Sequence, residues 1–201
     1  MLLDLQNFID QVRKQNVSAE REAVLQPLIE YIQQKVNENV PVHLNFICTH
    51  NSRRSQLAQI WAQTAAYYYD VAVSCYSGGV EVTAFNERAV DSIKRAGLKV
   101  ESEGGDNPLY KVHFSEKAKA IRAFSKVFDD QENQAKQFAA IMTCDHADEN
   151  CPFIPGTEQR IAVRYEDPKA FDDSPLEAKK YDERSLQIAT EMFYVFSKIS
   201  D

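Results

Sequence analysis

The fold of this chain is decided by residues 42–55, whose sequence is VHLNFICTHNSRRS. Residues 42–47 form an apolar run typical of a buried strand, and residues 56–67 repeat apolar side chains at helical spacing. Cys48 follows the apolar run directly, and five residues separate it from Arg54. The stretch therefore predicts a strand, a short loop and a helix in immediate succession, with Cys48 at the start of the loop and Arg54 at its end.

A loop in this position turns its backbone N–H groups inward, and the amino end of the following helix adds its own N–H groups. Together they form a nest for a tetrahedral oxyanion, and Arg54 adds a planar fork that can hold two oxygens. The positive electrostatic potential of these N–H groups and of Arg54 also stabilises a thiolate. Cys48 is therefore a candidate nucleophile, with Ser55 as a hydrogen-bond donor to it. The alternative is a small buried side chain at a strand end, but the spacing to Arg54 favours the catalytic interpretation. We expect the oxyanion to be bound by Thr49, His50, Asn51, Ser52, Arg53, Arg54 and Ser55.

Strand and helix patterns alternate through the rest of the chain. Further strands are expected at residues 71–75, 98–101, 138–143 and 161–165. This alternation predicts an α/β fold of three layers, with a mainly parallel sheet of four to five strands and helices on both faces. The active site of such a sheet lies beyond the carboxyl ends of its strands. We also expect Gly78 and Gly79 to form a turn and Thr83 to cap the next helix.

The length of 201 residues favours one domain with additions. Residues 1–40 have helical periodicity and are expected to form an N-terminal helical extension, whereas residues 41–201 form the α/β domain. Within that domain, the less regular stretch at about 107–137 is expected to be an insertion that contains a β-hairpin.

Composition excludes several classes of function. The chain has 23 Lys and Arg against 30 Asp and Glu, a net charge of −7, which argues against a nucleic-acid partner. No apolar run is long enough to span a membrane, and residues 1–10 lack the layout of a signal peptide. We therefore expect a cytoplasmic protein without a membrane partner, in which cysteines are catalytic or redox-active rather than structural bridges.

The motif formed by Cys48, five residues, Arg54 and Ser55, placed between a strand and a helix, resembles the signature of the low-molecular-weight tyrosine phosphatase superfamily. The resemblance implies that superfamily's fold and its oxyanion substrates. Those enzymes also use an Asp-Pro pair near the C-terminal end, which Asp167 and Pro168 match here. By resemblance, Asp167 is the general acid that protonates the leaving group.

A cysteine pair points to one branch of that superfamily. Cys144 and Cys151 follow the apolar run at 138–143, and this resembles the thioredoxin-coupled arsenate reductases, which add two redox cysteines to the phosphatase fold. The resemblance implies that Cys48 attacks arsenate, that Cys144 then attacks Cys48, and that Cys151 forms the final disulfide with Cys144, which thioredoxin reduces. Ordinary tyrosine phosphatases of this fold lack the pair.

Two other functions stay open at this stage. The first is phosphomonoester hydrolysis through a phosphocysteine at Cys48. The second is a catalytically weak oxyanion-binding module, favoured by His50, which stands where the family usually has glycine, and by the N-terminal helices. Arg53 also departs from the pattern of the arsenate reductases, which commonly have cysteine at this position.

We expect no cofactor and no metal. Some reductases of this branch carry a potassium site with an asparagine like Asn51 and a glutamate in the next helix, but the matching position here is Gln59. Zinc would have only Cys144, His146 and Cys151 as ligands, and no second ligand pair follows them. The remaining cysteine, Cys75, lies in an apparent strand and is expected to be a core thiol.

Overall fold

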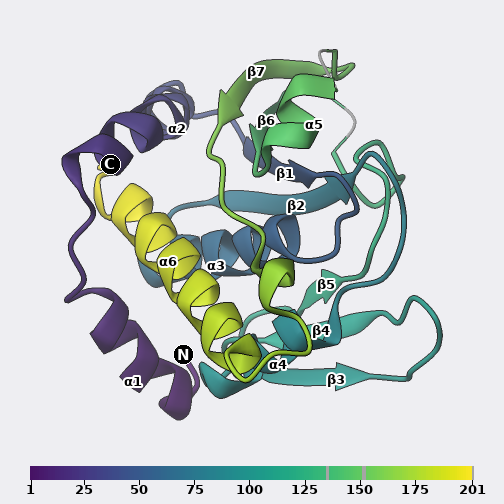
Figure 1. Ribbon diagram of the computed structural model, residues 1–201. Helices are drawn as coiled ribbons and strands as arrows, with labels where there is room; N and C mark the ends of the chain where they lie inside the picture. The colour runs from purple at the N-terminus through teal and green to yellow at the C-terminus, as the bar shows by residue number, and fades with distance from the viewer. Residues whose placement is uncertain (135, 151–152, 201) are drawn as a thin grey trace.

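The computed structural model describes residues 1–134, 136–150 and 153–200 and has three layers (Figure 1). Within these residues the main sheet has four parallel strands in the order β2-β1-β6-β7. The strands are β1 (Val42–Cys48), β2 (Val73–Gly79), β6 (Phe138–Met142) and β7 (Thr157–Ala162). The predicted α/β class, with a parallel sheet between helices, is confirmed.

Alternate side chains of the strands pack on opposite faces of the sheet, as strand geometry requires. On one face, Leu44, Phe46, Ala139 and Ile141 join the main core. This face is covered by α2 (Ala19–Asn37), α3 (Arg54–Tyr68) and α6 (Glu177–Ser197). On the other face lies a smaller cluster that contains Ile47, Phe138, Ala140 and Met142 and is closed by α5 (Asp145–Asn150) and by residues 128 and 154.

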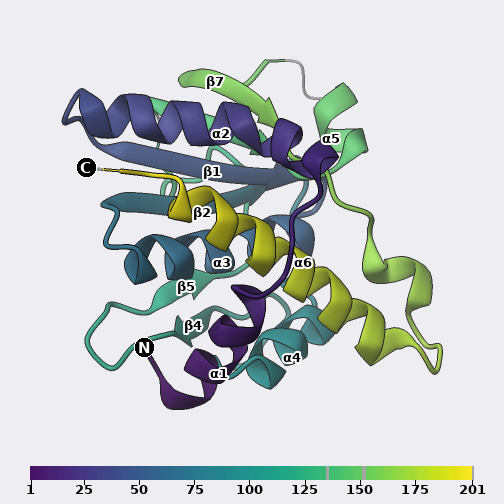
Figure 2. The same cartoon turned by 90° about the vertical axis from the view of Figure 1, so that its left-hand side faces the viewer.

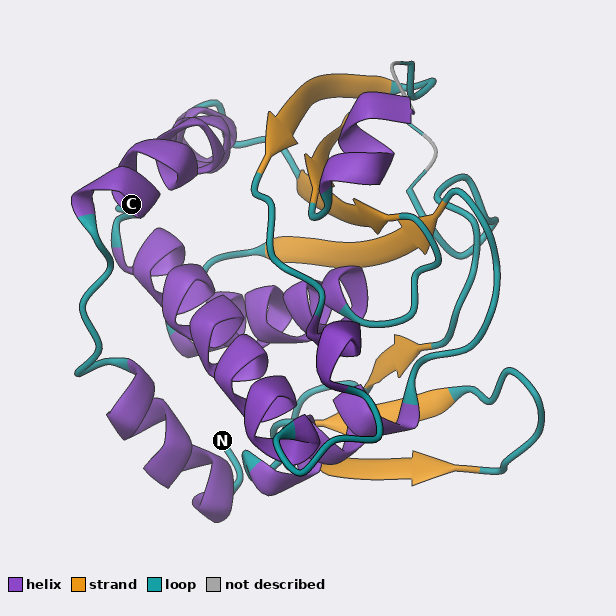
Figure 3. Ribbon diagram, in the orientation of Figure 1, coloured by secondary structure: helices purple, strands orange, loops and turns teal. Residues whose placement is uncertain are grey.

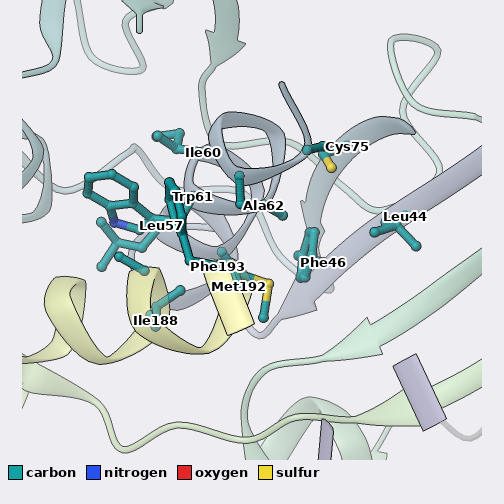
Figure 4. Close-up of a cluster of buried hydrophobic side chains, with 14 of the residues drawn as sticks. Leu44, Phe46, Leu57, Ile60, Trp61, Ala62, Cys75, Ile188, Met192 and Phe193 are labelled. Atoms are coloured by element: carbon teal, nitrogen blue, oxygen red, sulfur yellow. The ribbon is translucent and has the colours of Figure 1, made fainter. Parts of the chain in front are cut away.

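The packing of α3 against α6 forms the centre of the main core, as Figure 4 shows. Leu57 and Trp61 of α3 lie with Ile188 and Met192 of α6 in this fully buried cluster. The indole N–H of Trp61 donates to Ser185 Oγ at 2.9 Å, so the one polar atom of the ring is satisfied inside the core.

Cys75 also belongs to this core, as expected. Burial raises the pKa of the Cys75 thiol, which keeps it protonated and unreactive.

The N-terminal residues are helical, as predicted, and form α1 (Leu3–Val12) and α2. Their buried apolar residues, among them Leu5, Ile9 and Leu28, belong to the same core as the strands. Helix α6 lies against α1, α2, α3 and α4 (Glu87–Arg95), and Figure 2 shows this arrangement. The helix α1 passes so close to Gly97 that a Cβ there would lie 2.5 Å from Leu5 N.

A second sheet, again within the described part of the chain, has three antiparallel strands (Figure 3). It consists of β3 (Lys99–Ser102), β4 (Tyr110–His113) and β5 (Ile121–Ala123). The β-hairpin predicted within residues 107–137 is therefore confirmed and consists of β4 and β5. The prediction that residues 98–101 join the parallel sheet is wrong, because β3 pairs with β4 instead and exposes most of its side chains, whereas central parallel strands are buried on both faces.

The prediction of a turn at Gly78 and Gly79 is also wrong, because both residues continue β2. They are glycines because other backbone approaches them closely. A Cβ on Gly78 would lie 2.2 Å from Phe128 Cα, and one on Gly79 would lie 2.9 Å from Thr49 O. Strand β2 can therefore run alongside the loop that follows β1.

No described helix is both long and apolar enough to cross a membrane.

Candidate active site

Cys48 is the last residue of β1, at the carboxyl edge of the parallel sheet, and its side chain is buried. Ser55 lies in the first turn of α3, and its Oγ is 3.0 Å from Cys48 Sγ. The strand, loop and helix predicted for residues 42–67 are thus present, and the loop brings its first and last residues together.

Asn51 holds the loop in its curled shape. Its φ of +47° lies in the left-handed region, which asparagine tolerates better than most residues. Its Nδ2 donates to Ser55 Oγ at 2.8 Å, and its Oδ1 accepts from Lys126 N and Gln56 Nε2, both at 3.0 Å. Because Ser55 Oγ accepts this bond, its single hydrogen is available for Cys48 Sγ, as a thiolate requires.

His50 does not prevent the loop from closing. Its carbonyl accepts from Ser125 Oγ at 2.9 Å and from Thr83 Oγ1 at 3.3 Å, and its imidazole is 47% exposed beside Glu81 at 3.2 Å. The backbone of the loop is therefore held from outside while the ring lies at the rim. The prediction that Thr83 caps α4 is wrong, because Asn86 accepts the capping bond and Thr83 supports the loop instead.

Lys126 lies behind the loop and is only 4% exposed. Its main-chain carbonyl accepts from Gly79 N at 2.8 Å, and its Nζ is 4.6 Å from the centroid of the Phe124 ring. Burial lowers the pKa of Lys126 from its ordinary value to about 8.

Replacing Lys126 by methionine should raise the free energy of unfolding at pH 7 by about 3 to 4 kcal/mol, since the pKa falls from 10.5 to about 8 and each pKa unit is worth about 1.4 kcal/mol. The folded pKa is lower than the unfolded pKa, so the cost of burying the ammonium is fully present below pH 8. The cost disappears as the pH rises toward the unfolded pKa of 10.5. Urea unfolding of both proteins at pH 7 and pH 10.5 measures this, and a stability difference that is the same at both pH values would contradict it.

Arg54 joins the loop to Asp167, which is 113 residues further along the chain. Its Nη2 donates to Asp167 Oδ2 at 2.8 Å, and its Nη1 donates to the carbonyl of Tyr165 at 3.2 Å. The Nε of Arg54 is buried and has no hydrogen-bond partner among the described residues. A guanidinium oriented in this way retains a donor that an oxyanion can satisfy.

Asp167 stands at the amino end of the short helix η1 (Pro168–Phe171). Its Oδ1 accepts from Lys169 N at 3.1 Å, while its Oδ2 binds Arg54. The side chain is about one third exposed. The carboxyl group is therefore fixed by its neighbours and still accessible to a substrate.

Arg53 and Ser52 differ from the other loop residues in where their side chains lie. The Nε of Arg53 donates to Tyr181 OH at 2.7 Å and its Nη2 to Asp172 Oδ2 at 3.3 Å, while Ser52 Oγ donates to the Ala84 carbonyl at 2.7 Å. These side chains are engaged in holding the loop. Oxyanion binding by Arg53 and Ser52 stays a prediction for their main-chain N–H groups.

Cys144 follows β6 and is 1% exposed. It belongs to the same buried cluster as Cys48, and its Sγ is 3.5 Å from Thr49 Oγ1. The same hydroxyl is 3.3 Å from His146 Nδ1. The order of strands explains this proximity, because β1 and β6 are parallel neighbours whose carboxyl ends share one edge of the sheet.

Cys48, Cys75 and Cys144 are free thiols in the structure. Cys151 lies outside the described residues. Among the residues that are described, no group of three His, Cys, Asp or Glu side chains is placed to hold a metal ion. Gln59 uses its amide within the fold: its Nε2 donates to the Cys75 carbonyl and its Oε1 accepts from Ser77 Oγ.

An open cleft of about 480 Å³ adjoins the loop. His50, Ser52 and Arg53 line it on the loop side, and Arg88 and Lys169 contribute positive charge.

The structure also shows contributions that the sequence analysis missed. These are the carbonyl of Tyr165, the hydroxyl of Thr49 as a contact of Cys144, and the main-chain N–H of Lys126. A carbonyl or N–H group belongs to every residue type, so no side-chain pattern could have indicated the first or the last.

Comparison with known proteins identifies the family. No family model matches the chain. An arsenate reductase of Staphylococcus aureus is 30% identical to it over 125 residues, which are 61% of this chain and 76% of that protein. The chain belongs to the arsenate reductase family. Another member, an arsenate reductase of Halalkalibacterium halodurans, is 28% identical over 123 residues, covering 61% of this chain and 71% of that protein.

Solved structures agree with the family at the level of the fold. A low-molecular-weight phosphotyrosine phosphatase from Vibrio cholerae superposes with a TM-score of 0.53 at 12% identity, covering 78% of this chain and 94% of that one. An arsenate reductase in its oxidized state gives 0.50 at 18% identity, with 79% and 98% covered. The matching arsenate reductases confirm the branch that the cysteine pair suggested, and these structures agree with the fold of the superfamily.

Proposed function

We propose that this member of the arsenate reductase family reduces arsenate, with Cys48 as the nucleophile and Cys144 as the thiol that releases the product. The observation that carries the proposal is the position of Cys144, a second buried thiol in contact with Thr49 at the edge of the oxyanion loop. Phosphoester hydrolysis needs no such thiol, whereas reduction of arsenic needs a second electron-donating sulfur.

In the first step, arsenate occupies the loop, where main-chain N–H groups and Arg54 bind its oxygens. The Cys48 thiolate, stabilised by Ser55, attacks arsenic and forms a sulfur–arsenic bond. One hydroxyl leaves arsenic as water after it receives a proton from Asp167, which is held at 2.8 Å from Arg54.

In the second step, the Cys144 thiolate attacks the sulfur of Cys48. A disulfide between the two cysteines forms and the sulfur–arsenic bond breaks. The bonding pair stays on arsenic, which leaves as arsenite, reduced from As(V) to As(III). Thr49, whose Oγ1 is 3.5 Å from Cys144 Sγ, is placed to donate a hydrogen bond to the attacking thiolate.

Recycling requires a third thiol. In our proposal Cys151 attacks Cys144, which releases Cys48, and the resulting Cys144–Cys151 disulfide is reduced by a dithiol protein of the thioredoxin type. The assignment of Cys151 and of thioredoxin rests on the sequence resemblance.

Aryl phosphate hydrolysis is the second candidate activity. It is favoured by a specific observation: Cys48, Ser55, Arg54 and Asp167 already form a complete set for phosphocysteine chemistry without either redox cysteine. Arsenate and phosphate are nearly isosteric oxyanions, so the loop alone does not distinguish them.

The test of the proposed function compares two activities in one set of variants. Cys144→Ser should abolish thioredoxin-coupled arsenate reduction and leave hydrolysis of an aryl phosphate within about threefold of the unmodified protein, because only the former needs a second thiol. Cys75→Ala, which changes a thiol outside the site, is the matched control and should retain both activities.

Trapping gives an independent readout. After arsenate is added without a reductant, Cys151→Ser should accumulate a Cys48–Cys144 disulfide that peptide mapping detects. An undiminished arsenate rate in Cys144→Ser, or hydrolysis without any arsenate reduction in the unmodified protein, would refute the reductase proposal and favour the phosphatase.

Asp167→Asn should slow hydrolysis of esters with poor leaving groups by about 100-fold, the usual contribution of a general acid. Esters whose leaving oxygen is already a stable anion should lose much less, because they need no proton. Turnover of a series of aryl phosphates measures this dependence. Equal losses across the series would instead assign Asp167 the task of orienting Arg54.

A further inference from the structure

Arg21, near the start of α2, connects the N-terminal helices to the segment that carries Asp167. Its Nε and Nη2 donate to the two carboxylate oxygens of Glu191 at 2.9 and 2.6 Å. Its Nη1 donates to the main-chain carbonyl of Arg164 at 3.3 Å. One side chain from a helix at the start of the chain thus binds both α6 and the segment that leads to Asp167.

The same guanidinium also covers the ring of Tyr165, with its Cζ 5.2 Å from the ring centroid. Tyr165 and Glu191 are both buried. Burial, reinforced by the Glu191 carboxylate, raises the pKa of the Tyr165 phenol well above its ordinary value, so the ring stays neutral under the cation. The Arg21 side chain has little conformational freedom, because the edge of its guanidinium binds the Glu191 carboxylate and its face lies over the Tyr165 ring.

Arg54 contacts the same segment from the active-site side. It donates to the carbonyl of Tyr165 and to the carboxylate of Asp167, two residues further on. Arg21 therefore holds Arg164 and Tyr165, while Arg54 depends on Tyr165 and Asp167 for its own orientation.

The segment needs this support because its main chain has few other anchors. In the described part of the chain, the last main-chain hydrogen bond before η1 runs from Tyr165 N to Thr143 O, at 3.1 Å. After Tyr165 the segment is held by side-chain contacts. One of these is the bond from Arg184 to Glu166 at 3.2 Å, which gives little support because the Glu166 carboxylate is almost fully exposed. The orientation of Asp167 thus relies on how firmly residues 164 and 165 are fixed.

We propose that Arg21 is a positioning residue, which aligns Arg54 and Asp167 with the oxyanion loop by fixing Arg164 and Tyr165. This inference rests on the proposed function, in that it assigns Asp167 as the general acid and Arg54 as the oxyanion ligand. It gives the N-terminal helices a part in the active site, because Arg21 of α2 binds the segment that leads to Asp167.

The experiment compares Arg21→Lys with Lys35→Met. Lysine keeps the positive charge beside Glu191 but cannot hold Glu191 and Arg164 with one planar group. Lys35 is a matched control, because it lies on the same helix and forms an ion pair of 2.8 Å with Glu158 on β7, away from residues 164–167. Urea unfolding of each variant identifies the conditions in which all the proteins are folded, and the activities are compared under those conditions.

The first readout is the leaving-group dependence of aryl phosphate hydrolysis. Arg21→Lys should lower turnover of a poor-leaving-group ester about tenfold, as a small misplacement of a catalytic group does, and affect a good-leaving-group ester less. In an Asp167→Asn background the selective part of this loss should disappear, so that Arg21→Lys lowers turnover of the poor ester no more than that of the good ester. An equal loss for both esters, an undiminished selective loss in the Asp167→Asn background, or a response no larger than that of Lys35→Met would overturn the proposal.

The second readout does not depend on turnover. Inorganic phosphate titrated by calorimetry reports the alignment of Arg54, and Arg21→Lys should weaken its binding several-fold while Lys35→Met does not. If the chain proves to have neither activity, the proposed function fails, and this titration alone decides the inference. Unchanged phosphate affinity in Arg21→Lys would overturn it.

Glu191→Gln provides a second variant should Arg21→Lys fold poorly. The amide keeps the shape of the carboxylate but removes its negative charge, which weakens the hydrogen bonds with Arg21. The same selective loss of turnover on the poor-leaving-group ester should therefore appear. Normal leaving-group dependence in this variant would count against the proposal.

Discussion

Replacing Cys48 by serine should abolish both arsenate reduction and aryl phosphate hydrolysis, lowering turnover by at least about four orders of magnitude, as the loss of a nucleophile does. A serine hydroxyl in this loop stays protonated, because the field that stabilises a thiolate cannot ionise an alcohol near neutral pH. The main-chain N–H groups and Arg54 are unchanged. Binding of inorganic phosphate, measured by calorimetry, should therefore stay within about threefold of the unmodified protein.

Cys75→Ala is the control for this experiment, since it removes a buried thiol that lies in the core and outside the loop. Normal turnover of either substrate by the Cys48→Ser protein would show that another group is the nucleophile. Loss of phosphate binding together with turnover would show that the serine had distorted the loop, and the arrangement of Asn51 and Ser55 around position 48 argues against this.

Replacing Arg54 by lysine should lower turnover about 100-fold or more and weaken phosphate binding in parallel, a loss of the size seen when one oxyanion donor is removed. Lysine offers a point charge and cannot bind the Tyr165 carbonyl, Asp167 and an oxyanion with one planar group. The loss should appear in both measurements, because the guanidinium binds the oxyanion in the ground state and in the transition state.

Arg53→Lys is a matched control for this variant, because the two arginines are neighbours in the sequence. The guanidinium of Arg53 binds Tyr181 and Asp172, so its loss should reduce stability more than oxyanion affinity. Should Arg53→Lys weaken phosphate binding more than Arg54→Lys does, the assignments of the two side chains would have to be exchanged.

The cysteine loop could be predicted from sequence because its structure is local. Residues 48 and 55 are joined by one tight loop, and the types that it needs are visible in order: a thiol at the end of a strand, Asn51 for left-handed backbone, and Arg54 at the start of a helix. Short-range constraints of this kind act within about eight residues, and Ser125 and Lys126 then support the loop from outside.

Strand partners were harder to predict, because an apolar run indicates a strand without indicating its sheet. The strand β3 follows α4 as a further strand of an alternating α/β pattern would, yet it pairs antiparallel with β4 in a separate sheet. Likewise, Gly78 and Gly79 suggest a turn by residue type alone. Their actual cause, the close passage of residues 49 and 128, exists only once the chain is folded.

The sequence by itself therefore determined the position of Cys48 at the start of its loop, the loop itself and the α/β class, all of which follow from periodicity and from contacts between near neighbours. Only the tertiary structure decided what surrounds that loop. Asp167 meets Arg54 across 113 residues and Cys144 meets Thr49 across 95, while Arg21 reaches Arg164 across 143. The order β2-β1-β6-β7 places the carboxyl ends of β1 and β6 side by side, and the packing of α2 on α6 brings Arg21 to Glu191. These contacts depend on which strands and helices become neighbours, a choice made by burial of the whole core rather than by any stretch of residues.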